Sequence, residues 1–119
     1  MRSSVLVVDD DSAFRGLAAR VLTGWGHRVI GEAGTVADAV RRAVELEPDI
    51  ALVDVGLPDG DGFALARRLV ALAHPVRVVL VSASADAAQQ PAARRAGAVA
   101  LLPKEQLADS SLRLLLEGR

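Results

Sequence analysis

The sequence of 119 residues has no cysteine and no tyrosine, and only 3% of its residues are aromatic. Without cysteine the chain cannot form a disulfide, a thiolate zinc site, an iron–sulfur cluster or a thiol nucleophile. A chain of this length can bury roughly two thirds of the surface that its unfolded form exposes, so its core needs no such cross-link. We therefore expect one small globular domain over residues 1–119.

Excess charge of one sign and long hydrophobic runs are also missing. The chain has 14 basic and 15 acidic side chains, and Lys104 is its only lysine. This balance gives no basic surface for a polyanion, so we expect no nucleic-acid binding by this chain alone. The apolar runs are far shorter than the ~20 residues of a membrane span, and carboxylates precede any run of signal-peptide length. We expect a cytoplasmic protein without membrane contact.

The sequence does contain a regular alternation of two kinds of segment. Short apolar runs typical of buried strands lie at residues 5–8, 28–30, 50–53, 76–81 and 98–102. Segments with helical periodicity lie at residues 13–23, 36–46, 62–73, 85–96 and 105–117. This (βα)5 alternation predicts a parallel sheet covered by helices on both faces. Right-handed crossovers favour the strand order 2-1-3-4-5, which is a doubly wound, flavodoxin-like α/β fold.

Local signals set several of these boundaries. Capping residues or turns are predicted at residues 10–12, 35–38 and 59–62. Gly97 is placed to end the fourth helix before the last strand. Pro91 lies inside that same helix, which makes the fourth helix the doubtful element of the pattern.

Polar side chains follow four of the five predicted strands. The first strand is followed by Asp9 and Asp10, the third by Asp54, the fourth by Ser82, and the fifth by Lys104. Ligands of an open parallel sheet bind at these carboxyl ends, near the point where the strand order reverses. Neighbouring strands lie about 4.8 Å apart, so three of these ends would meet, and the lysine side chain could bridge the remaining ~10 Å.

Three carboxylates gathered at one edge repel one another unless a cation neutralises them. An all-oxygen cluster suits a hard divalent ion, and Mg²⁺ typically uses one or two carboxylates together with a phosphate oxygen. A lysine and a hydroxyl are suitable contacts for that phosphate. The residues by themselves therefore predict a magnesium-dependent phosphoryl site with Asp54 as the candidate nucleophile.

Each of these residues also has a simpler structural interpretation when it is taken alone. Helix capping alone would explain the acidic residues after the first strand, and a turn alone would explain Ser82. Lys104 could be an ordinary solvated lysine. Asp54 ends a fully apolar strand, where an unpaired charge is costly. The combination of these residues at neighbouring strand ends favours the functional interpretation.

The sequence resembles the receiver domain of bacterial two-component response regulators, over essentially the whole chain. The resemblance is carried by VLVVDD at residues 5–10, PDIALVDVGLPDGDG at residues 48–62, the Ser82-Ala83 pair and Lys104. It implies that Asp54 accepts a phosphoryl group from the phosphohistidine of a sensor histidine kinase. It further implies that Asp9, Asp10, Asp54 and the Gly56 carbonyl are the Mg²⁺ ligands. Ser82 would be the switch hydroxyl, the Ala83 amide would face the phosphoryl group, and Lys104 would pair with its charge.

The chain departs from this family pattern at three places. Leu101 stands where the family often has an aromatic switch residue, so aromatic coupling to Ser82 is unavailable. Glu105, in place of proline, follows Lys104, a variant that resembles the subgroup with a helix-turn-helix output domain. Gly56 stands where larger residues are common, which leaves more open access to a phosphoryl group on the acceptor.

We expect a phosphorylation-controlled switch, whose only catalysis is its own phosphorylation and dephosphorylation. Its expected partners are a histidine kinase and a downstream output domain or target protein. The alternative is a degenerate receiver that acts by constitutive protein contact without phosphorylation. A third possibility, a small-molecule phosphatase, is disfavoured because the chain has no cap domain and no second aspartate two positions after Asp54.

The leucines of the last predicted helix do not form a single stripe. Leu107 and Leu114 lie on one side, and Leu112, Leu115 and Leu116 on another. They either wrap the helix into the core or leave an apolar contact face. In the second case the last strand and helix would support a homodimer or target binding, with Leu101 reporting the state of Ser82.

The remaining histidines and aromatic residues have plain structural interpretations. His27 and His74 flank loops, so we expect them at the surface rather than in catalysis. Phe14, Trp25 and Phe63 are expected to pack in the core or against helices.

Overall fold

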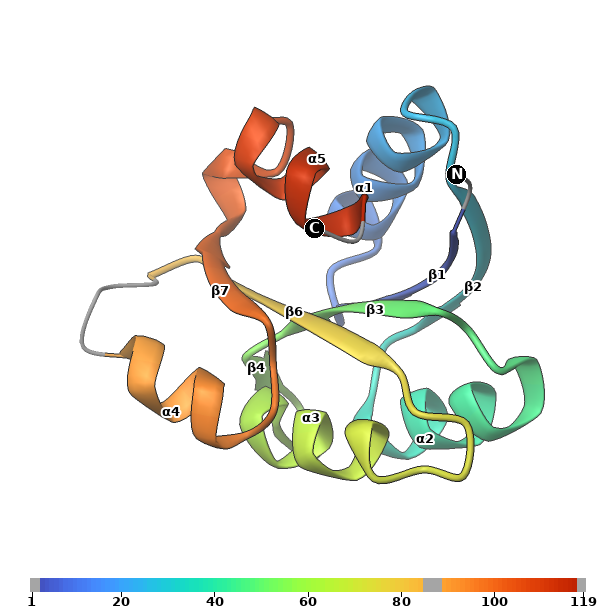
Figure 1. Ribbon diagram of the computed structural model, residues 1–119, viewed down its shortest axis with the longest axis vertical. Coiled ribbons are helices and arrows are strands. Elements are labelled where there is room, and N and C mark those ends of the chain that lie inside the picture. Colours follow the sequence, from blue (N-terminus) through green and yellow to red (C-terminus); the bar gives the residue numbers. More distant parts are fainter. Residues whose placement is uncertain (1–2, 85–88, 118–119) are drawn as a thin grey trace.

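A five-stranded parallel sheet forms the centre of the computed structural model, which describes residues 3–84 and 89–117 (Figure 1). Its strand order, β2-β1-β3-β6-β7, is the predicted 2-1-3-4-5, with β6 and β7 as the fourth and fifth sheet strands. Two short strands, β4 and β5, form a separate antiparallel hairpin after β3. The strands are β1 (Ser4–Val8), β2 (Arg28–Ala33), β3 (Ile50–Asp54), β4 (Gly56–Leu57), β5 (Gly60–Asp61), β6 (Arg77–Ser82) and β7 (Ala100–Pro103).

Helices cover both faces of the sheet, as the alternating pattern predicts. Figure 1 shows α1 (Ser12–Gly24) and α5 (Ser110–Leu116) on one face. The other face carries α2 (Val36–Leu46), α3 (Gly62–Val70) and α4 (Gln90–Arg95). No helix within the described residues is both long enough and apolar enough to cross a membrane.

The core consists of two layers, one on each face of the sheet. Successive residues of β1 alternate between them: Leu6 and Val8 pack on the α2–α3–α4 side, and Val5 and Val7 on the α1–α5 side. Both faces of the strand are therefore buried, which explains why its sequence is continuously apolar. The sheet is fixed in register, and the carboxyl ends of β1 and β3 lie side by side.

Most predicted boundary signals are confirmed. Asp11, Thr35 and Asp61 are the N-caps of α1, α2 and α3, and each side chain accepts a backbone hydrogen bond two or three residues further on. Gly97 follows α4 with φ 87°, a conformation that glycine adopts without steric cost. The third helix ends at Val70 rather than at residue 73.

The prediction of one continuous helix over residues 105–117 is wrong. A 3-10 turn covers Lys104–Gln106, and α5 starts only at Ser110. Asp109 is the reason, because its carboxylate accepts from the Ser111 backbone N–H at 3.1 Å and starts a new helix. The strand before this segment is also displaced, to Ala100–Pro103 from the predicted 98–102.

The doubtful fourth helix is present but shorter than the predicted 85–96. It begins at Gln90, and Pro91 lies in its first turn, where a missing N–H breaks no helical hydrogen bond. Residues 85–88 of the predicted helix lie outside the described residues.

The prediction that His27 lies at the surface is wrong. The side chain is buried, and its Nδ1 accepts from the Ser3 backbone N–H at 3.4 Å. Burial lowers the pKa of the imidazole. The backbone N–H of His27 donates to the Leu22 carbonyl, and this hydrogen bond folds the turn back onto the end of α1. His74 is exposed, as predicted.

Candidate functional site

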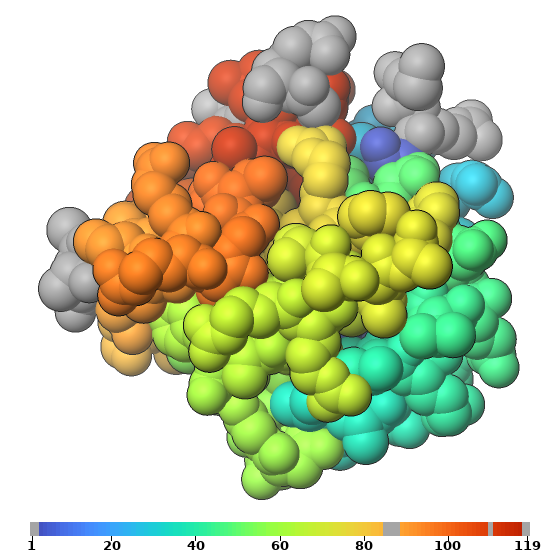
Figure 2. All heavy atoms as spheres, turned by 60° about the horizontal axis from the view of Figure 1, so that its bottom comes forward, coloured from blue at the N-terminus to red at the C-terminus, as the bar shows by residue number. Residues whose placement is uncertain are grey.

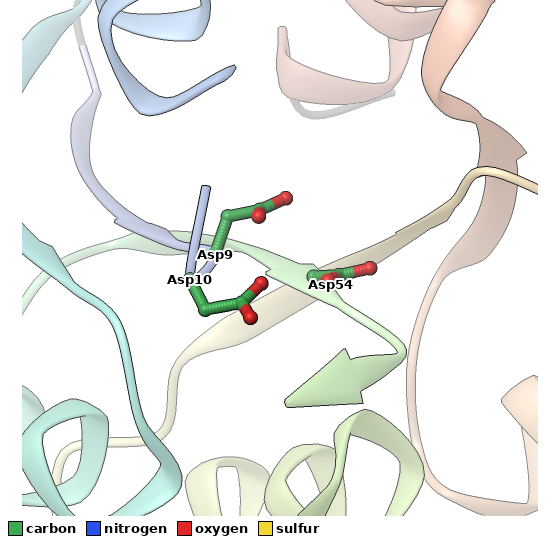
Figure 3. Close-up of side chains that lie close together, drawn as sticks. All are labelled: Asp9, Asp10 and Asp54. Carbon is green, nitrogen blue, oxygen red and sulfur yellow. The ribbon is translucent and has the colours of Figure 1, made fainter. Parts of the chain in front are cut away.

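Asp9, Asp10 and Asp54 lie together at the carboxyl edge of the sheet (Figure 3). Asp54 is the last residue of β3, and Asp9 directly follows the neighbouring β1. One carboxylate oxygen from each of the three residues lies within 4.8 Å of the others. The strand order therefore brings together the acidic residues that the sequence singles out.

Lys104 reaches this cluster from the end of β7. Its Nζ lies 2.6 Å from Asp9 Oδ2 and 3.7 Å from Asp54 Oδ2. Burial acts against the ammonium charge, but the two carboxylates outweigh it and raise the lysine pKa. The ammonium therefore stays charged at neutral pH and compensates part of the acidic cluster.

Asp54 is buried and electrostatically costly to ionise. Burial is the largest cause that raises the pKa of its carboxyl, and the charge of Asp9 adds to it. Lys104 and a hydrogen bond from the Gly56 backbone N–H act in the opposite direction without cancelling the rise. Ionised Asp54 thus lowers the stability of the fold at neutral pH. A further cation at this edge would reduce that electrostatic cost.

The donor set fits a hard divalent cation. Three carboxylates offer only oxygen ligands, which is the chemistry that Mg²⁺ prefers. Asp9 Oδ1 accepts from the Asp11 backbone N–H at 2.9 Å, and the buried Oδ2 lies 2.6 Å from the Lys104 ammonium. Asp10 is exposed and gives the cluster access from solvent. Gly56 borders the site, and a Cβ there would meet nothing within 4 Å.

Ser82 ends β6, the strand on the other side of β3. The side chain is buried, and its Oγ accepts from the Ser84 N–H at 3.2 Å. Asp54 pairs with Val81 in the sheet, so the hydroxyl-bearing strand end lies next to the acceptor strand end. Ala83 follows directly and is exposed. This neighbourhood agrees with the predicted placement.

Leu101 is almost fully buried on the α4 side of the sheet, with 1% of its surface exposed. Its backbone carbonyl accepts from the Gln90 side chain at 2.8 Å. The residue therefore ties β7 to the beginning of α4, two positions before Pro103, the partner of Ser82 in the sheet.

Two contacts to the site come from α1 and were missed by the sequence reasoning. The Phe14 ring centroid lies 4.6 Å from Lys104 Nζ. Arg15 donates from Nη1 to the Asp9 backbone carbonyl and pairs through Nε with Glu32 at 3.0 Å. No local pattern marks these residues, because their partners belong to other parts of the fold: the end of β1, the strand β2 and the turn after β7.

Asp59 has a role that the sequence did not reveal. Its carboxylate accepts from the backbone N–H groups of Val36 at 2.7 Å and Ala37 at 3.1 Å. These are the first residues of α2, whose unpaired N–H groups attract a negative charge. Asp59 therefore ties the β4–β5 hairpin, which begins two residues after Asp54, to the neighbouring helix.

We expect Asp59→Ala to lower the midpoint of thermal unfolding at neutral pH. The backbone hydrogen bonds to Val36 and Ala37 lower the pKa of Asp59 from 3.8, so its stabilising effect is full above that pH. The effect is lost as the pH falls through and below 3.8, where the carboxyl takes up a proton. Thermal melts of both proteins across this range should therefore converge at low pH. Glu45→Ala, an exposed change on the same helix, serves as the control, and an Asp59→Ala melt equal to wild type at neutral pH would contradict the capping role.

Known proteins resemble this chain in both sequence and structure. Residues 5–116 match the family model described as the response regulator receiver domain. The chain is 40% identical over 118 residues to protein-glutamate methylesterase/protein-glutamine glutaminase 5 of Anaeromyxobacter dehalogenans, covering 97% of this chain and 32% of that protein. It is 31% identical over 98 residues to chemotaxis protein CheY of Thermotoga maritima, covering 82% of each chain.

The crystal structure of the response regulator domain of Thermotoga maritima CheB superimposes with a TM-score of 0.86 and 28% identity. That alignment covers 98% of this chain and 96% of the other. The chain spans only 30% to 50% of the length of the first curated relatives that it matches. The family match over residues 5–116, together with this fold, shows that the chain belongs to the receiver domain family of two-component response regulators.

Proposed function

We propose that this receiver domain accepts a phosphoryl group on Asp54 from the phosphohistidine of a sensor histidine kinase. The observation that carries the proposal is the buried Asp54 carboxylate, grouped with Asp9 and Asp10 and lying 3.7 Å from the Lys104 ammonium. A nucleophile of this kind needs positive charge nearby when a dianionic phosphoryl group arrives. The site supplies one fixed cation and the ligands for a second.

The chemistry that follows is an in-line displacement at phosphorus. A carboxylate oxygen of Asp54 forms a bond to phosphorus while the bond from phosphorus to the histidine nitrogen breaks, and the released imidazole takes up a proton from solvent. Lys104 pairs with the charge of the transferred group. The Ser82 hydroxyl and the Ala83 N–H, from the neighbouring strand end, donate hydrogen bonds to its oxygens.

Receiver domains bind Mg²⁺ at an acidic pocket, and the Asp cluster of this chain could hold such an ion. We assign its protein ligands to the Asp9, Asp10 and Asp54 carboxylates and the Gly56 backbone carbonyl. When bound, Mg²⁺ neutralises charge on the phosphoryl oxygens during transfer.

Receiver domains act with histidine kinases and output domains. For this chain we propose that the phosphoryl group acts as a switch signal, read at Ser82 and carried through Leu101, and that the only catalysis is at Asp54 itself. The methylesterase relative extends far beyond the part that this chain matches. A cytoplasmic location belongs to the same proposal, because the phosphohistidine donor lies on that side of the membrane.

The last helix offers only a small apolar contact face. Within α5, Leu112 and Leu116 are core residues, whereas Leu114 is 59% exposed. Leu107, which precedes the helix, is also a core residue. A homodimer or a target complex through β7 and α5 would therefore use Leu114 as its apolar contact. No observation favours the degenerate receiver over the phosphorylated one.

We expect incubation with acetyl phosphate and Mg²⁺ to add one acid-stable, base-labile phosphoryl group to the protein. The label should be absent from Asp54→Asn and after removal of Mg²⁺ with a chelator, and present in Asp38→Asn, which changes an exposed carboxylate on α2. Intact-mass and peptide mass spectrometry measure both the amount and the position. A label on Ser82 or Asp9 would contradict the assignment, and no label under any condition would favour the degenerate receiver.

A further inference from the structure

The Lys104 ammonium lies against two carboxylates and one aromatic ring. It lies 2.6 Å from Asp9 Oδ2, 3.7 Å from Asp54 Oδ2 and 4.6 Å from the centroid of the Phe14 ring. The resting position is therefore closer to Asp9 than to the proposed phosphoacceptor. The lysine side chain is 21% exposed, so the ring and the carboxylates provide much of its surroundings.

Phe14 is fixed by its own packing. It lies in the first turn of α1 and packs, partly buried, against the core layer between the sheet and the helices α1 and α5. A cation within about 6 Å of an aromatic ring centroid is attracted to the face of the ring. At partly exposed sites this attraction corresponds to about a two- to five-fold preference for the contact. The ring thus has both the position and the rigidity to bias where the ammonium lies.

A phosphoryl group on Asp54 would change this balance. It brings nearly two negative charges and three acceptor oxygens to Asp54, whose carboxylate lies 3.7 Å from the ammonium. Movement of Nζ toward Asp54 weakens its contact with the ring, because the attraction to an aromatic face falls steeply with distance. Among the described side chains, Phe14 is the aromatic residue that touches the site, since Phe63 packs in the opposite core layer and Trp25 contacts Arg113.

We propose that Phe14 is a positioning residue for Lys104. Its ring and Asp9 hold the ammonium in the resting position, and phosphorylation of Asp54 draws the ammonium off the ring, which passes the change of charge to α1. The second half of the proposal rests on the function proposed above. In this chain an aromatic residue on α1 would then respond to phosphorylation, whereas the family position for an aromatic switch residue is occupied by Leu101.

The helix α1 is connected to α5 at its other end. Trp25, the C-cap residue of α1, lies with its ring 5.9 Å from the Arg113 guanidinium of α5. Both Phe14 and Trp25 pack against the same core layer. A change at Phe14 can therefore reach α5 through α1, without passing through α4.

The single lysine makes the proposal directly measurable. Protein labelled with ¹³C,¹⁵N-lysine gives one set of side-chain NMR signals, from Lys104. Protons above the face of a ring resonate upfield, so we expect upfield-shifted ε-methylene protons in the resting protein. Phe14→Leu should abolish the shift, Phe14→Tyr should retain it, and Phe63→Leu should leave it unchanged. Adding Mg²⁺ and beryllofluoride, a phosphoryl analogue, should reduce the shift in wild type.

Each result decides one half of the proposal. A resting shift that is absent, or that survives in Phe14→Leu, overturns the positioning role. A resting shift that beryllofluoride leaves unchanged, while acetyl phosphate labels Asp54, overturns the coupling to α1. If no label forms on Asp54, the proposed function and the coupling fail together, and the resting shift still decides the positioning role. Because Phe14→Tyr preserves the ring, poor folding of Phe14→Leu would not leave that role undecided.

Discussion

Gly62→Ala is expected to destabilise the fold by about 3 kcal/mol and to slow phosphorylation of Asp54. A Cβ at position 62 would collide with the Asp54 carbonyl oxygen and lie 2.8 Å from the Val55 Cα. One is a backbone atom of the last residue of β3 and the other of the residue that follows, so neither can move aside as a flexible side chain would. The start of α3 would have to shift away from the acceptor strand.

That shift would break the hydrogen bond from the Gly62 N–H to the Val55 carbonyl, which is 2.7 Å long. It would also pull Leu65 and Leu69, both fully buried on α3, out of their packing. The acceptor carboxylate would then lose its fixed position relative to Lys104, which is why phosphorylation should slow.

Gly56→Ala is the matched control for this prediction. It also adds one methyl group shortly after the end of β3, but nothing lies within 4 Å of its Cβ, and its backbone carbonyl is kept. Chemical denaturation should show near-wild-type stability for Gly56→Ala and a clear loss for Gly62→Ala. Equal stability of the two variants would mean that α3 does not press against the end of β3 as described.

The sequence was sufficient for features that depend on local pattern and chain topology. Buried strands covered on both faces are continuously apolar, and right-handed crossovers allow few strand orders. Once that order is assumed, Asp9, Asp54 and Ser82 must lie at neighbouring strand ends, and the structure places them there. The same strand order predicts that the Lys104 side chain can reach the carboxylates, because the last strand lies only one strand beyond that of Ser82.

Features that depend on a partner distant in sequence could not be predicted. Asp59 caps α2 from 23 residues away, and Phe14 meets Lys104 only because the fold brings the start of α1 next to the residue that follows β7. His27 looks like a loop residue until its turn folds back over α1. The break in the last helix was missed because the leucine spacing continued across Asp109, although a capping aspartate was present in the sequence.

Lys104→Met is expected to lower the free energy of unfolding by about 2–3 kcal/mol in the presence of a chelator. Methionine keeps the apolar stem but removes the ammonium beside Asp9, which is fully buried. A buried carboxylate without its partner is costly, and Asp54 loses the charge that lowers its pKa. Denaturation curves of the two proteins at neutral pH measure the loss. The deficit should shrink as the pH falls and Asp54 takes up a proton, because a neutral carboxyl needs no counter-charge.

Mg²⁺ should restore more stability to Lys104→Met than it adds to wild type. The variant presents the same three carboxylates without a competing ammonium, so the cation binds a more negative site and stabilises the folded state by mass action. Asp9→Asn provides the internal control: combined with Lys104→Met in chelator, it should recover part of the lost stability, because the unpaired charge is gone. Equal stabilisation of wild type and Lys104→Met by Mg²⁺ would show that the ammonium and the metal ion do not share the Asp9–Asp54 charge. Greater stabilisation of Lys104→Met by Mg²⁺, the result that we expect, identifies Lys104 as the cation that stabilises the resting acidic cluster. Once another cation and a phosphoryl group occupy the site, the cluster no longer needs the ammonium at that position.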